Sequence, residues 1–195
     1  MQFPLSIAFK ILTLVPQMSV RDAAEHEIGY VRSKLFAFRE NVTVFSDATQ
    51  SQPIYGIQAD RVIDFTANYH FTDRSGHQIG FVRREGFKSL WRAHYIISVG
   101  AQATFEVREA NPFVRLVDNL IGEIPFIGLL TGYILNPTYN VTRIGTDALS
   151  FTMTKQPAFL ESRFAIVQHA PVEPDEQACL LLGLMMIILL ERARG

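Results

Sequence analysis

The chain has 195 residues, of which 48% are hydrophobic and 19% charged, a composition that excludes disorder and predicts a packed globule. Its net charge of −1 argues against a protein-wide field for nucleic acid, so no nucleic-acid partner is expected. The length suits a single domain, residues 1–195, and the lone cysteine, Cys179, cannot form an intrachain disulfide, which favours a cytoplasmic location.

The amino terminus is apolar but does not have the pattern of a signal peptide. Lys10 interrupts the apolar run, and neither a basic start nor a small-residue cleavage site is present. Phe3, Leu5, Ile7 and Phe9 alternate with other residues. This alternation predicts a half-buried strand.

An eleven-residue motif, which we call the repeated phrase, occurs twice, 51 residues apart: DAAEHEIGYVR from Asp22 and DRSGHQIGFVR from Asp73. In each copy a polar turn precedes a run of β-forming residues, which is typical of a β-hairpin. A third, less exact copy of the repeated phrase begins at Ser46. Repeated hairpins predict an all-β sheet or barrel. Gly29 and Gly80 lie inside strands, where glycine marks a bulge or a close approach.

The histidines of the two copies allow another interpretation, in which His26 and His77 are paired metal ligands. Turn histidines are more often solvated, so no metal site is predicted. Elsewhere, residues 101–108 and 149–154 alternate between apolar and polar side chains, as strands with one buried face do. We count ten to twelve strands, each about six residues long.

Two segments interrupt the strand pattern. Residues 87–93, FKSLWRA, are expected to form one helical turn between strands. Residues 111–122, NPFVRLVDNLIG, are expected to form a short amphipathic helix, with Pro112 at its first position and Gly122 at its end. This helix opens an insert of about residues 111–137.

The carboxyl-terminal segment contains thirteen consecutive apolar residues, Ala178 to Leu190. Thirteen helical residues rise ~20 Å, short of the ~30 Å hydrocarbon core of a membrane. Strands of six residues span ~20 Å as well. We therefore predict a helix of about residues 175–192 enclosed in a closed antiparallel barrel, with Glu173, Asp175 and Glu176 near its positive start. Gly29 and Gly80 would then be places where wall and helix come close.

These residues resemble a known family. FTDRSGHQIGFVRREGFKSLWRAHYII, followed by TDALSFTMTKQ and SRFAIVQ before the last helix, is similar to the LURP-one-related group of the tubby carboxyl-terminal-like superfamily. The resemblance covers essentially the whole chain and implies a barrel of about twelve strands threaded by a hydrophobic helix. Related members bind phosphoinositides or are linked to lipid scrambling and calcium, and no reaction is implied. The 111–137 insert departs from compact plant-type members, so no role is carried over to it.

No catalytic set is visible in the sequence. It lacks G-x-S-x-G, H-E-x-x-H, a phosphate-binding glycine loop and a dinucleotide fingerprint, so no cofactor is expected. Cys179 is predicted to be inert inside the apolar helix. His70 and His94 flank the central hairpin, and ordinary hydrogen-bonded histidines are favoured over a facing pair.

Two features are candidates for binding. The cations Arg83, Arg84, Lys88 and Arg92 form a candidate headgroup site, against the alternative of a solvated strand end. The candidate membrane contacts are Trp91, Phe126, Leu129 and Leu130. The last three lie in the apolar run 124–135, for which a lid over one barrel mouth is favoured over a membrane-dipping loop.

The sequence therefore predicts a non-enzymatic barrel that binds phospholipid headgroups or tethers to membrane surfaces. An alternative is a structural or protein-interaction domain with no ligand in its barrel. A small-molecule carrier or enzyme with a site at a barrel mouth ranks last. The expected location is cytoplasmic, with peripheral association at a membrane.

Overall fold

The computed structural model describes residues 1–10, 15–32, 42–61, 67–85, 93–110, 137–158 and 161–192, which form twelve strands and a carboxyl-terminal helix. The strands are β1 (Leu5–Lys10), β2 (Gln17–Arg21), β3 (Glu27–Arg32), β4 (Val42–Phe45), β5 (Pro53–Ala59), β6 (Asn68–Thr72), β7 (Gln78–Arg84), β8 (His94–Val99), β9 (Gln102–Glu109), β10 (Thr138–Arg143), β11 (Leu149–Gln156) and β12 (Glu161–Gln168). The helix, α3, spans Pro174–Arg192.

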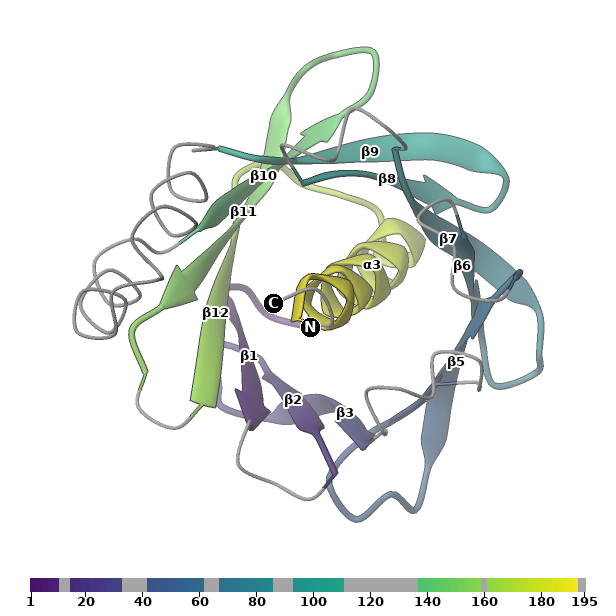
Figure 1. The fold of residues 1–195 in the computed structure, drawn as a ribbon, viewed down its shortest axis with the longest axis vertical. Helices are drawn as coiled ribbons and strands as arrows, with labels where there is room; N and C mark the ends of the chain where they lie inside the picture. Colours follow the sequence, from purple (N-terminus) through teal and green to yellow (C-terminus); the bar gives the residue numbers. More distant parts are fainter. Residues whose placement is uncertain are drawn as a thin grey trace, which may run out of the picture.

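The strands form a closed antiparallel barrel in which each strand pairs with its neighbours in sequence and β1 closes against β12. Figure 1 shows this ring of strands around α3. The predicted fold class, a closed antiparallel barrel around a hydrophobic helix, is confirmed. We call the end that carries the five hairpin turns and the start of α3 the turn end, and the end where α3 finishes the loop end.

The repeated phrase folds into the same turn each time. The Asp22 Oδ1 atom accepts hydrogen bonds from the backbone amides of Ala24 and His26, and Asp73 Oδ1 accepts from those of Ser75 and His77. An aspartate favours such turns because its side chain replaces missing backbone partners. In the third copy, Asp47 Oδ1 accepts a hydrogen bond from the backbone amide of Thr49. The predicted hairpins are confirmed.

The three turns share a backbone feature as well. The third residue after each aspartate has a positive φ: Glu25 at 61°, Gln50 at 58° and Gly76 at 84°. The amide of each of these residues donates to the carbonyl of its aspartate. The sequence anticipated this role for Gly76, whereas Glu25 and Gln50 adopt the same conformation without being glycine.

Each hairpin at the turn end contains a β-bulge of one extra residue. The register shifts in all five hairpins place one extra residue on the second strand. In the three copies of the phrase this residue is an isoleucine: Ile28, Ile54 or Ile79. All three pack against the core. The next residue, Gly29, Tyr55 or Gly80, pairs with an inward-facing residue of the preceding strand.

The barrel interior is filled by α3, whose residues from Cys179 to Leu189 are all buried. Inward-facing strand residues such as Ile7, Phe71, Ile97 and Val141 complete the same core. A helix without a polar face requires such an enclosure. Among the described residues, no helix is long and apolar enough to cross a bilayer.

The helix lies against one side of the barrel, where it contacts β6, β7 and β8. A Cβ atom on Gly80 would lie 2.9 Å from Cys179 Sγ and would also clash with the Ser98 carbonyl oxygen. The expected close approach at Gly80 is therefore confirmed. It is not found at Gly29, where the three atoms nearest to a Cβ atom are Val20 and Val44 carbons of the wall, at 3.6–3.8 Å.

The helix predicted over residues 111–122 and the turn over 87–93 lie wholly or largely outside the described residues. The amino-terminal strand is confirmed as β1, with Leu5, Ile7 and Phe9 facing the core.

Candidate functional site

The start of α3 is held by charged side chains at the turn end. Arg143 donates two hydrogen bonds to Glu176, of 2.9 and 2.7 Å, and Glu176 also accepts from the backbone amide of Glu173. The Arg143 guanidinium holds the pKa of the Glu176 carboxyl below its usual range. The predicted arrangement, with acidic residues at the helix start and Pro174 in its first turn, is confirmed.

The finish of α3 is held at the loop end by different groups. The fully buried Tyr95 donates a 2.5 Å hydrogen bond to Glu191. Arg192 donates to the Ser162 hydroxyl and lies over the Phe9 ring, 4.7 Å from its centroid. Both ends of the helix are thus fixed to the wall.

The titratable groups inside the barrel are unsuited to nucleophilic chemistry. Burial raises the pKa of Cys179 to about 12, and its thiol donates to the Ile79 carbonyl oxygen at 3.2 Å. Burial also raises the pKa of Tyr95 well above its ordinary value. Both groups therefore stay protonated, which agrees with the prediction that Cys179 is inert.

Of the four predicted headgroup cations, the structure describes Arg83 and Arg84. Arg83 is exposed on β7 and forms a 3.0 Å ion pair with Glu85. Arg84, expected at the surface, is 9% exposed, and its guanidinium lies 5.8 Å from the Tyr95 ring centroid. This expectation is corrected because residues alternate along a strand, so Arg84 shares the inward face of Gly80 and Val82.

The remaining predicted residues, Lys88, Arg92, Trp91, Phe126, Leu129 and Leu130, lie outside the described residues. The strands that lead into their two segments do lie side by side. The Glu109 amide donates to the Ala93 carbonyl at 3.1 Å, and the Ala110 amide donates to the Thr138 carbonyl at 2.7 Å. Segments 86–92 and 111–136 therefore start from neighbouring strands at the loop end.

The described histidines differ in their hydrogen bonding, and the prediction of hydrogen-bonded histidines is confirmed for His94 alone of the pair His70 and His94. His94 Nε2 bonds to Glu106 Oε1 at 2.5 Å, as predicted for a hydrogen-bonded histidine. The His70 ring packs on Phe81 with centroids 5.6 Å apart, and its buried Nδ1 atom has no hydrogen-bond partner among the described residues, so the predicted hydrogen bond is not found there. Ser75 bonds to the exposed ring of His77. Across the described ranges, no three His, Cys, Asp or Glu residues are grouped as a metal site.

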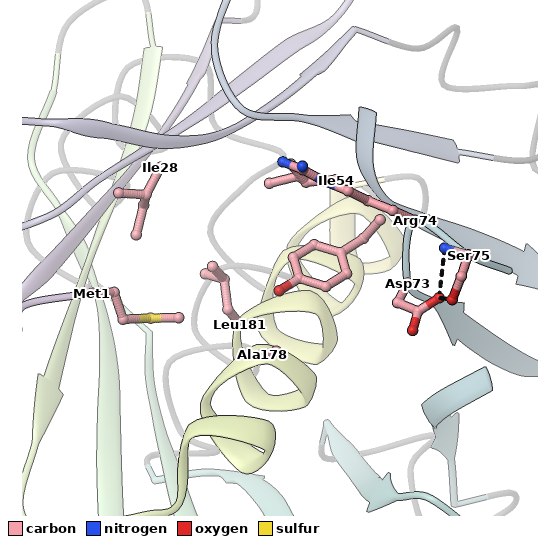
Figure 2. Close-up of a pocket in the computed structure, with 9 residues that line it drawn as sticks. Met1, Ile28, Ile54, Asp73, Arg74, Ser75, Ala178 and Leu181 are labelled. Carbon is pink, nitrogen blue, oxygen red and sulfur yellow. Dashed lines mark hydrogen bonds between the residues drawn. The ribbon is translucent and has the colours of Figure 1, made fainter. Parts of the chain in front are cut away.

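A cavity at the turn end has no counterpart in the predicted sites. Its volume is about 570 Å³, and Figure 2 shows it beside α3, with Ala178 and Leu181 of the helix at its edge. The residues that line it are Met1, Ile28, Ile54, Tyr55, Asp73, Arg74, Ser75, Ala178 and Leu181. The isoleucine that follows each repeated turn was the one signal in the sequence that pointed to this place.

No protein-family model, curated protein or solved structure matches this chain.

Proposed function

We propose that this barrel is a non-enzymatic binding domain that attaches to anionic membrane surfaces through its loop end. The observation that supports the proposal is that the start of β8 and the end of β9 lie next to each other. Ala93 and Ala110, which flank the cationic and the apolar segment, belong to hydrogen-bonded neighbouring strands. In the proposal, the cations and the apolar run act together from this edge of the barrel.

This combination suits a membrane surface. Cations near an anionic leaflet each contribute about 1 kcal/mol of attraction, and apolar or aromatic side chains beside them enter the interface. Within the proposed set, Arg83, Lys88 and Arg92 provide the attraction and Trp91 the interfacial ring. Arg84 is assigned a different role, because its guanidinium is buried beside Tyr95 and supports the inner wall.

Vesicle co-sedimentation tests the proposal. Lys88→Glu combined with Arg92→Glu is expected to weaken binding to phosphatidylserine vesicles by about 4 kcal/mol, roughly a thousandfold. The matched control is Arg21→Glu with Arg163→Glu, an equal charge change at two exposed arginines of the outer wall. The control should bind nearly as the wild type does.

The dependence of vesicle binding on salt and the comparison of the two double variants together test whether cations at the loop end make the contact. Binding through exposed cations should fall steeply as salt is raised, because charges are screened beyond ~10 Å at 0.1 M. Equal losses in both double variants would show a response to net charge alone and would overturn the assignment to the loop end. Absence of vesicle binding by the wild type would leave the alternative of a protein-interaction domain as the better proposal.

A further inference from the structure

The cavity at the turn end exists because α3 lies off the barrel axis. The helix packs against β6, β7 and β8, which leaves space beside β3 and β5 near the helix start. A volume of about 570 Å³ is within the ~300–1,000 Å³ typical of small-molecule sites. The cavity opens to solvent beside the exposed turn residues Arg74 and Ser75, so a ligand can enter it without unfolding the barrel.

The inner part of the cavity is apolar. Two bulge isoleucines, Ile28 and Ile54, form one side, and Ala178 and Leu181 of α3 form the floor. Each bulge places an extra residue on its strand, and these isoleucines pack at the edge of the core. The walls therefore fit a hydrocarbon chain.

Two hydrogen-bond donors stand at the same cavity. Tyr55 of β5 lines it, and so does Arg74, whose side chain extends across its upper side in Figure 2. Within the described part of the chain, neither group forms a hydrogen bond or ion pair. Burial raises the pKa of Tyr55, so its hydroxyl keeps the proton that it would donate.

The nearest carboxylate does not satisfy Arg74. Asp73 Oδ1 instead accepts hydrogen bonds from the Ser75 hydroxyl at 2.6 Å and from the amides of Ser75 and His77. In the other two copies of the turn the residue after the aspartate is an alanine, Ala23 or Ala48. The turn therefore does not require an arginine at this position, and the exposed Arg74 side chain is available to a ligand in the cavity.

We propose that this cavity binds a single-chain anionic amphiphile, with its hydrocarbon chain against Ile28, Ile54 and Leu181 and its anionic head on Arg74 and Tyr55. Two donors that the lining carboxylate, Asp73, does not bind fit a carboxylate or phosphate head, whereas a cationic head would meet the Arg74 charge. A purely apolar ligand would leave both donors unused. The site lies at the opposite end of the barrel from the proposed membrane contact and does not depend on it.

Calorimetric titration below the micellar concentration tests the proposal with four probes that share one chain: dodecanoate, dodecyl phosphate, dodecanol and dodecylamine. The two anions should bind, and dodecanol should bind roughly tenfold to a hundredfold more weakly, the usual worth of a charged hydrogen bond. The tighter of the two anions distinguishes a free fatty acid from a phosphate-headed lipid.

Three variants locate the site. Arg74→Gln should reduce the affinity for the preferred anion to that for dodecanol and leave dodecanol binding unchanged. Arg21→Gln removes an exposed arginine outside the cavity and should change neither affinity. Ala178→Phe fills the apolar floor and should abolish binding of every probe.

A measurement on the wild type avoids dependence on any variant. Methyl NMR signals of Ile28, Ile54 and Leu181 should shift on titration with the preferred anion, while those of Ile166, a β12 residue that does not line the cavity, should not. Equal affinity for dodecanoate, dodecanol and dodecylamine would overturn the proposal. So would the absence of binding, or methyl shifts confined to residues outside the cavity.

Discussion

The two full copies of the repeated phrase, Asp22–Arg32 and Asp73–Arg83, make the same hairpin in different surroundings. Both have the aspartate-bonded turn, the positive φ at the third residue and the isoleucine bulge. At Gly80 the wall meets the helix, with Cys179 bonded to the carbonyl of Ile79. At Gly29 the nearest atoms belong to the wall residues Val20 and Val44, and Ile28 lines the cavity instead.

The difference shows that the conformation of the hairpin and the packing around its glycine have separate causes. Hydrogen bonds within a few residues determine the turn and its bulge, so the two copies agree there. The packing of each glycine depends on where α3 lies in the bore, and α3 lies against β7 but not β3. The third copy has Tyr55 at the equivalent position, where the space beside the helix accepts a large side chain.

The largest expected effect comes from the helix that distinguishes the copies. Leu184→Asp should prevent folding or leave the chain aggregated, because an unpaired charge would be buried among apolar side chains at a cost of several kcal/mol. Val167→Asp, on a strand position that is 43% exposed, is the control and should fold. Circular dichroism and size-exclusion chromatography compare them. A soluble Leu184→Asp protein with the wild-type melting temperature would show that the helix is not enclosed.

Alanine at the two glycines tests the comparison directly. Gly80→Ala should destabilise the protein by about 1–3 kcal/mol, because the new methyl group meets Cys179 and a backbone carbonyl. Gly29→Ala should have an effect within about 0.5 kcal/mol, since its neighbours lie at ordinary contact distances. For a chain of this size 1 kcal/mol corresponds to a Tm change of about 2–4 °C. Equal Tm changes in the two variants would mean that the helix does not distinguish the copies.

The smallest effect concerns the turn that the copies share. Gly76→Ala should cost about 1 kcal/mol, because φ is 84° and a Cβ atom there would touch nothing, so the effect is backbone strain alone. Glu25→Gly should stabilise the matching turn by a smaller amount, because glycine also gains freedom in the unfolded chain. Urea denaturation measures both changes. Effects of the same sign would contradict the common turn.

Several features of the fold followed from local patterns in the sequence. The alternation around Phe105 and Met153 predicted strands, and the phrases at Asp22 and Asp73 predicted hairpins. The apolar run Ala178–Leu190 predicted an enclosed helix. Each of these patterns reflects either bonds between near neighbours or the simple need to bury apolar surface, so each is readable from the sequence.

The site was predicted less well, for identifiable reasons. Arg84 was grouped with Arg83 as a surface cation, although adjacent residues of a strand face opposite sides. The bulges at Ile28 and Ile54 were not foreseen, because they depend on the pairing register across the hairpins. Lys88 and Arg92 remain predictions, since they lie outside the described residues.

The sequence by itself determined the repeated turns, the strands and the enclosed helix, because these depend on short-range hydrogen bonds and on the periodicity of apolar residues. The tertiary structure alone decided where in the bore the helix lies. That placement results from side-chain volumes on many strands, including the close contact of Gly183 with Ile97. It brings Gly80 against the helix, leaves Gly29 free of it and opens the cavity beside Tyr55 and Arg74.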